Sequence, residues 1–299
     1  MSAPAPALAA PAAARAVEEA AGAARPIGLE EVTARAELLT RFDRSYLVPA
    51  DTFVRVMARL TDPHRPGGPF RALTIDDHRA FGYHSVYYDT PALRSFHDHR
   101  QGRRLRFKIR ERVYQESGER QFEIKLKGRR GDTVKRRRPL TGADAPLDDP
   151  CQAFLAATLR EAYGIEAPEA LTPSLSTDYR RATFVADGER VTCDAGLLCT
   201  DLRTGRTVRC DDGLVLVETK SAGHLTETDL LLNDHGVRPA VFTKYCGAYA
   251  ALRPALPANR WRRAAHRAFP DGAGHPDPGA PGPRRPWARA PVAYGTMHA

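Results

Sequence analysis

The chain has 299 residues, a formal charge of +9 at neutral pH and five cysteines. No stretch approaches 18 consecutive apolar residues and the N-terminus lacks a Leu-rich run, so we expect neither a membrane span nor a signal peptide. An odd number of cysteines without a CxxC pair predicts buried or idle reduced thiols. Together these features predict a cytoplasmic protein, with a transit-like leader as the alternative.

The two ends of the chain are predicted to be disordered. Residues 1–36 form an Ala/Pro-rich leader with few large apolar side chains, and residues 255–299 form a tail rich in Arg, Pro and Gly. Residues 37–254 remain as one globular domain, which is long enough for a single core. Seven Arg and two Asp give the tail a charge of +5, and three Arg and four Glu give the leader a charge of −1. Of the total of +9, the domain therefore carries +5. That charge predicts an anionic partner, which is nucleic acid, an acidic lipid surface or a phosphorylated small molecule.

Six segments of this domain alternate in polarity at every second residue, which is the period of a β-strand. They are, in chain order, RFDRSYLV (41–48), RFKIRERVY (106–114), QFEIKLK (121–127), TVKRRRP (133–139), ERVTCDAG (189–196) and LVLVETKS (214–221). Short connections between successive segments predict antiparallel hairpins. Helices are predicted from apolar periodicity at residues 51–60, 151–164, 226–236 and 247–253.

Alternate residues of segment 106–114 lie on one face of the predicted strand. That face carries four cations, Arg106, Lys108, Arg110 and Arg112. Like charges side by side repel, and folding alone gives no reason to align them. For a single strand, a charged face in water is the simpler interpretation, but repetition over five or more strands favours a barrel with a charged interior. The predicted fold is therefore α+β, an antiparallel β-barrel or tunnel with helices packed outside.

A tunnel lined by Arg and Lys matches the dense, linear charge of polyphosphate and of nucleoside triphosphates. Transfer of a phosphoryl group also requires a divalent cation held by a carboxylate. Glu218 and Glu123 are the candidates, because each lies two residues before a lysine on the same strand face. Glu218 is the stronger metal candidate, while a salt-bridge role is an equal alternative for Glu123. No phosphate-binding loop, dinucleotide-binding, histidine-metal or serine-hydrolase motif is present in the sequence, and the basic run 127–138 only weakly indicates nucleic-acid binding.

Nine segments, in this order along the chain, are similar to those of a known family. They are RFDRSYLV (41–48), SVYYDTPAL (85–93), KIRERVY (108–114), FEIKLK (122–127), VKRRR (134–138), TDYRRATF (177–184), RVTCD (190–194), VLVETK (215–220) and FTKYCGAY (242–249). Over roughly residues 38–253 the chain resembles the bacterial type of VTC domain, the polyphosphate polymerase domain of the triphosphate tunnel metalloenzyme superfamily. The resemblance implies an eight-stranded tunnel.

The resemblance also implies an activity and a set of site residues. ATP or another triphosphate would bind with Mn²⁺ or Mg²⁺, and its γ-phosphate would pass to a growing chain of inorganic polyphosphate. Lys125, Lys244 and Glu218 would be catalytic, and Glu218 would hold the metal. Lys108 and Arg137 are added to the phosphate ligands because they share strand faces with the others. The full set of predicted phosphate ligands is Lys108, Arg110, Arg112, Lys125, Lys135, Arg137, Arg181, Arg190 and Lys244.

Position 45 departs from the family pattern, which usually has Lys where this chain has Ser45. The substitution removes a phosphate-binding cation from the first strand. This change favours, as one alternative function, a non-catalytic polyphosphate- or nucleotide-binding module. A second alternative is a triphosphate hydrolase of the same superfamily, in which water replaces polyphosphate as the acceptor. Nucleic-acid binding is not expected of the core and is an alternative for the basic C-terminal tail alone.

Overall fold

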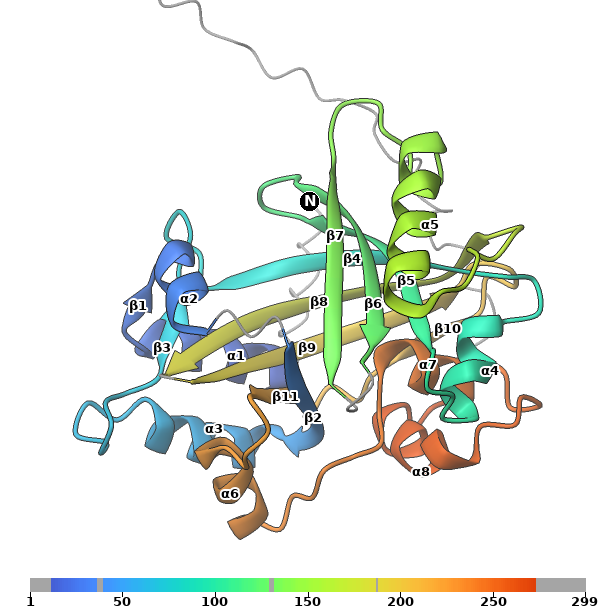
Figure 1. Cartoon of the computed structure of the whole chain (residues 1–299). Coiled ribbons are helices and arrows are strands. Elements are labelled where there is room, and N and C mark those ends of the chain that lie inside the picture. The colour runs from blue at the N-terminus through green and yellow to red at the C-terminus, as the bar shows by residue number, and fades with distance from the viewer. Residues whose placement is uncertain (1–11, 37–39, 129–131, 187, 273–299) are drawn as a thin grey trace, which may run out of the picture.

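The computed structural model describes residues 12–36, 40–128, 132–186 and 188–272 (Figure 1). Its strands are β1 (Pro26–Ile27), β2 (Thr40–Pro49), β3 (Arg71–Leu73), β4 (Ala80–Asp89), β5 (Phe107–Tyr114), β6 (Arg120–Lys127), β7 (Thr133–Leu140), β8 (Thr172–Ala186), β9 (Glu189–Asp201), β10 (Thr207–Arg209) and β11 (Leu214–Ser221). Its helices are α1 (Ala12–Ala23), α2 (Leu29–Ala36), α3 (Ala50–Leu60), α4 (Arg94–Arg100), α5 (Asp149–Tyr163), α6 (Glu227–Asp234), α7 (Lys244–Leu252) and α8 (Asn259–Ala268). Each strand and helix expected from the sequence pattern overlaps one of these elements.

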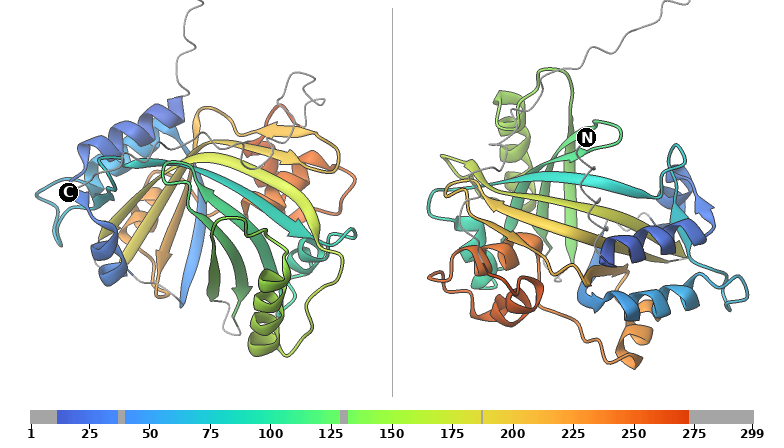
Figure 2. Two further views of the ribbon diagram at one scale, coloured as in Figure 1. Left: turned by 90° about the horizontal axis from the view of Figure 1, so that it is seen from above. Right: turned by 180° about the vertical axis from the view of Figure 1, so that it is seen from behind.

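Eight of the strands form a closed antiparallel circuit, in the order β8, β4, β5, β6, β7, β2, β11 and β9, and β9 pairs again with β8. Figure 2 shows the sheet curling back on itself, with the helices on its outer side. Closure pairs the strand edges that an open sheet would leave exposed. The predicted α+β fold, an eight-stranded antiparallel tunnel, is confirmed.

Strand alternation divides the side chains between the interior and the outer helices. Phe107 and Ile109 of β5 point outward and pack with Leu155 and Leu159 of α5 in one apolar cluster. A second cluster joins α1 and α3 to the outer faces of β2, β9 and β11. Because successive strand residues point to opposite faces, this packing turns the charged residues of the same strands into the tunnel.

The prediction that both chain ends are disordered is wrong for the described parts of those ends. Within the leader, α1 buries its small residues Ala13, Ala16, Val17 and Ala21. Alanine favours helix and lets a helix approach a sheet closely, so the leader needs no large apolar residues in order to pack. Within the tail, α8 buries Trp261 in the main apolar cluster. Residues 1–11 and 273–299, which share the same prediction, lie outside the described residues.

All five cysteines are free and buried, as expected. Burial raises the pKa of each thiol, because a thiolate is poorly solvated in an apolar interior. Among the described helices, none combines the length and the apolar character needed to cross a membrane.

Candidate functional site

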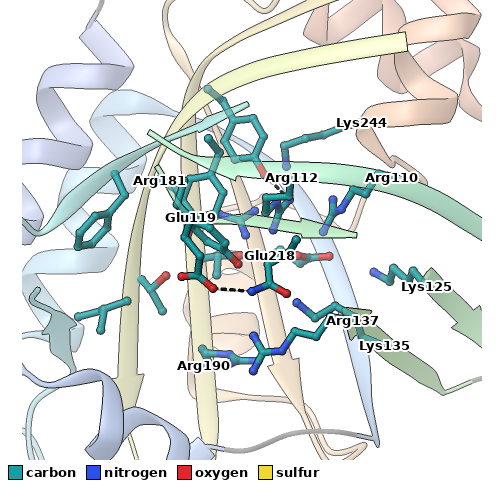
Figure 3. Close-up of a pocket in the computed structure, with 18 of the residues that line it drawn as sticks. Arg110, Arg112, Glu119, Lys125, Lys135, Arg137, Arg181, Arg190, Glu218 and Lys244 are labelled. Carbon is teal, nitrogen blue, oxygen red and sulfur yellow. Dashed lines mark hydrogen bonds between the residues drawn. The ribbon is translucent and has the colours of Figure 1, made fainter. Parts of the chain in front are cut away.

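The tunnel encloses a cavity of about 760 Å³ (Figure 3). All ten residues of the predicted catalytic, phosphate-binding and metal set line this one cavity, although they come from six strands and a helix; the alternative metal candidate Glu123 is not among the lining residues. They are Lys108, Arg110 and Arg112 of β5, Lys125 of β6, Lys135 and Arg137 of β7, Arg181 of β8, Arg190 of β9, Glu218 of β11 and Lys244 of α7. The structure thus brings the predicted residues together; their roles remain a proposal.

Three lysines form a row across neighbouring strands. Lys125 lies directly opposite Lys108 on β5 and directly opposite Lys135 on β7. Like charges in this cross-strand arrangement destabilise a sheet. Burial lowers the pKa of Lys135 to about 8, although the nearby Glu123 opposes this change, and burial also lowers the pKa of Lys108. A bound anion would reduce the repulsion among these lysines and would compensate their buried positive charge.

Glu123 is a structural counter-ion within this cationic wall. Its Oε2 accepts a hydrogen bond from Arg110 Nε at 2.7 Å, and its Oε1 accepts one from Lys135 Nζ at 2.6 Å. Arg112 Nη1 lies 4.0 Å from Oε2, and the Glu123 side chain is 1% exposed. Burial opposes ionisation, but the three cations outweigh it and hold the pKa of Glu123 well below its usual value. Of the two roles considered for Glu123, the structure supports the salt bridge.

Asp194 on β9 has the same function on the opposite wall, and the sequence pattern gave it no role. Its carboxylate accepts two hydrogen bonds from Arg181, at 2.5 and 2.7 Å, and pairs with Lys244. Burial raises its pKa, but these two cations outweigh that effect and lower the pKa to about 2. Lys244 reaches the cavity from the first turn of α7, where the Thr243 hydroxyl caps the helix by accepting from Cys246 N at 3.2 Å.

Two tyrosines that the sequence analysis did not single out hold three of the cations in place. The rings of Tyr83 and Tyr179 stack with centroids 5.4 Å apart and an interplanar angle of 7°. Arg112 lies 4.9 Å and Arg181 5.1 Å from the Tyr83 centroid, and Lys244 Nζ lies 4.6 Å from that of Tyr179. Arg112 Nη2 also donates to the Tyr179 hydroxyl at 2.8 Å. Cation–π contacts orient cations without adding a negative charge, so these rings hold the three cations in place without neutralising them further.

Glu218 on β11 is more accessible than the other two carboxylates. Its side chain is 25% exposed, and Oε2 lies 2.9 Å from Lys220 Nζ. Lys220, another residue that the prediction missed, also donates to the Thr192 hydroxyl at 2.7 Å, and burial lowers its pKa to about 7 although Glu218 opposes this shift. Burial likewise opposes ionisation of Glu218, but Lys220 and Lys125 outweigh it and keep the pKa of Glu218 well below its usual value. The carboxylate is therefore ionised and lines the cavity.

The residues present fit a divalent cation that is shared with a substrate. Among the described residues, no group of three or more His, Cys, Asp or Glu side chains is placed to enclose a metal ion. Mg²⁺ is commonly bound through one or two carboxylates, with substrate phosphates and water completing its coordination. Glu218 can supply such a carboxylate from the cavity wall, so a metal would depend on phosphate oxygens for further ligands.

Ser45 lines the cavity, as the sequence pattern of β2 predicts. It lies directly opposite Glu218 on the neighbouring strand. Arg44, the next residue back along β2, points to the outer side, where it pairs with Asp229 at 3.2 Å. Arg44 therefore does not replace the cation that the family usually has at position 45.

The fold and the lining together define a class of protein, an antiparallel tunnel whose interior is lined by lysine and arginine side chains. The model of the VTC domain family matches residues 40–253, and the chain belongs to this family, within the triphosphate tunnel superfamily. No curated protein matches the chain.

Solved structures with a similar fold are distant in sequence. A candidate adenylate cyclase from Bacillus halodurans is 14% identical, with 68% of this chain and 93% of that chain covered and a TM-score of 0.42. A candidate adenylyl cyclase from Hippeastrum, described as having a dominant triphosphatase activity, is also 14% identical, with 73% and 98% covered and a TM-score of 0.37. A candidate adenylate cyclase from Vibrio parahaemolyticus is 10% identical, with 79% and 93% covered and a TM-score of 0.35.

Proposed function

We propose that the protein is a metal-dependent polyphosphate polymerase that transfers the γ-phosphate of ATP to a growing polyphosphate chain. The observation that carries the proposal is the convergence of nine predicted phosphate ligands and the accessible carboxylate of Glu218 on one cavity. A linear polyanion is the ligand that a long cationic lining of this kind holds best.

In this proposal the side chains position the phosphates and balance their charge. Arg110, Arg112 and Arg181 donate charge-assisted hydrogen bonds to the phosphate oxygens, while Glu123 and Asp194 fix the orientation of these guanidinium groups. Mn²⁺ or Mg²⁺, when bound by Glu218 and the substrate, supplies further stabilisation of the charge on the transferred group.

The transfer itself exchanges one phosphorus–oxygen bond for another. A terminal oxygen of the polyphosphate chain bonds to the γ-phosphorus of ATP, and the bond from that phosphorus to the bridging oxygen of ADP breaks. The products are ADP and a chain that is longer by one phosphate. With water as the acceptor, the same arrangement would hydrolyse the triphosphate.

Ser45 supports a second candidate, a polyphosphate- or nucleotide-binding module without turnover. Its hydroxyl lines the cavity where the family usually has an ammonium group, so one cation fewer is available to stabilise the transferred phosphate. The other cations of the lining would still bind a polyanion.

The deciding experiment is incubation of the purified protein with ATP and Mn²⁺, followed by gel detection of polyphosphate and separate measurement of free phosphate. Polymer supports the polymerase, free phosphate without polymer supports a hydrolase, and tight polyphosphate binding without either product supports the binding module. Lys135→Ala and Arg136→Ala are a matched pair, because these neighbours on β7 point respectively into the cavity and outward toward Glu161. If the two variants were equal in product formation and in polyphosphate binding, the tunnel would not be the site of these functions.

A further inference from the structure

One end of the cavity differs in chemistry from the cationic middle. There the lining includes Leu29 and Val32 of α2, Leu73 and Ile75 around the end of β3, and Phe81 of β4. Leu29 and Ile75 are 55% and 37% exposed, although most large apolar side chains of the protein are buried. We call these five residues the apolar rim.

The apolar rim is held in a fixed place by the segment that precedes β2. Strand β1 pairs in parallel with β3, with Ile27 beside Leu73, and Thr74 N donates to Ile27 O at 2.9 Å (Figure 1). Arg71 then joins the two sides by pairing with Glu31 of α2 at 2.5 Å. The family match begins at residue 40, so α2 adds to the tunnel a wall that lies outside the matched residues.

Carboxylates lie near the apolar rim and do not suit a phosphate. Ile75 and His78 exchange two backbone hydrogen bonds across a two-residue turn, in which Asp76 and Asp77 have φ values of 45° and 62°. Asp76 and His78 line the cavity at this turn, and the acidic residue Glu116 is anchored nearby through hydrogen bonds from Gly82 N at 2.8 and 2.9 Å. Carboxylates repel a phosphate chain, whereas they accept hydrogen bonds from hydroxyl and amino groups.

We propose that the apolar rim binds the nucleoside end of a nucleoside triphosphate, whose phosphates extend into the cationic cavity. Base and sugar offer what this end of the cavity can bind, namely apolar faces for Leu29 and Ile75 and hydroxyl donors for Asp76. The cavity is continuous between the two parts, so one ligand can occupy both. The proposal rests on the proposed function, because it requires that the cationic part holds the triphosphate.

Titration calorimetry with two ligands tests the nucleoside site at the apolar rim separately from the triphosphate site in the cationic part of the cavity. ATP and inorganic tripolyphosphate share the triphosphate, and ATP alone carries a nucleoside. We expect the wild-type protein to bind ATP more tightly than tripolyphosphate. Loss of part of the contact with Leu29 or Ile75 is expected to weaken ATP binding about 5-fold for each residue.

The variant for this test is Leu29→Ser/Ile75→Ser, which alters two exposed side chains and leaves the buried core intact. Its matched control is Leu230→Ser on α6, a residue that is 51% exposed and does not line the cavity. The double variant should weaken ATP binding on the order of 20-fold and leave tripolyphosphate binding unchanged, whereas the control should bind both ligands as the wild-type protein does. Equal weakening of both ligands, or ATP binding equal to wild type, would overturn the nucleoside site while the phosphate site stands. Failure of tripolyphosphate to bind the wild-type protein would overturn the proposed function as well.

Discussion

Two strands of the tunnel carry the same short pattern, a glutamate followed two residues later by a lysine, and use it differently. On β6, Glu123 is 1% exposed and pairs with Arg110 and Lys135, while Lys125 pairs with Asp43 instead. On β11, Glu218 is 25% exposed and pairs with Lys220 of its own pattern.

Strand neighbours explain the difference. Glu123 lies between Arg110 and Arg137 on the adjoining strands, so cations surround it. Glu218 lies between the uncharged residues Ser45 and Thr192. The comparison teaches that the role of a carboxylate in this tunnel is set by the residues directly across from it. Glu123 therefore maintains the fold, and Glu218 is available to a metal.

Replacement of Glu123 tests the structural half of the comparison and should have the largest effect. Glu123→Gln leaves Arg110 and Lys135 without their buried counter-ion, and we expect the free energy of unfolding to fall by about 3 kcal/mol or more. Urea denaturation measures the change, with Glu218→Gln as the control on the other strand. A Glu123→Gln protein as stable as wild type would show that the two glutamates are equivalent.

Glu218→Gln tests the other half of the comparison, the availability of Glu218 to a metal ion. Hard divalent cations prefer anionic oxygen ligands, so we expect Mn²⁺ affinity and metal-dependent turnover to fall on the order of 100-fold, with the fold intact. Metal titration and turnover assays on the folded variant check this expectation. Wild-type metal affinity in the variant would remove Glu218 from the metal site.

The pH dependence of stability should report on Asp194. Its pKa is about 2 in the folded protein, below the ordinary value of 3.8, so its ionised form stabilises the fold above pH 4. This contribution, about 2 kcal/mol, should be lost as the pH falls from about 4 toward 2. Thermal unfolding across this range should show a smaller pH dependence in Asp194→Asn than in wild type. Identical slopes would contradict the assignment.

Two cavity cations should separate binding from stability. Lys125→Ala removes a side chain that is 37% exposed, so we expect triphosphate affinity to fall about 10-fold and the free energy of unfolding to change by less than about 1 kcal/mol. Arg110→Ala should weaken binding similarly but also destabilise the protein, because Arg110 holds Glu123. Calorimetric binding and urea denaturation of both variants distinguish the two effects. Normal triphosphate binding by both would place the ligand elsewhere.

Ser45→Lys should have the smallest effect. It places an ammonium group in the cavity where a neutral hydroxyl now lies, and a charged contact exceeds a neutral one by about 1 kcal/mol. We expect triphosphate binding to tighten about 5-fold and polymer synthesis to rise if this position limits turnover. Binding no tighter than that of the parent protein would show that the other cations already suffice.

Alternating polarity was enough to predict much of this molecule. It identified Lys108, Arg110 and Arg112 as an inward stripe, because a strand admits only two faces and the apolar one must meet the helices. The fourth cation of that pattern, Arg106, precedes β5 and does not line the cavity. It could not assign the role of Glu123, since that role depends on which residues lie across from it on β5 and β7.

Other features needed the three-dimensional structure because no local pattern signals them. Tyr83 and Tyr179 stack although 96 positions separate them in the chain, and Asp194 meets Lys244 only after α7 has folded against the tunnel. Packing of α1 escaped prediction because its buried face consists of small residues, which composition alone does not distinguish from a linker.

The reactivity of the buried cysteines can report local unfolding of the protein. Alkylating reagents attack the thiolate, which burial disfavours, so modification has to await exposure of each thiol to water. Cys151 lies on α5, Cys193 on β9 and Cys246 on α7, beside three different parts of the tunnel wall. The labelling rate at each position therefore measures how often that part of the wall unfolds under native conditions, without any probe having to be introduced.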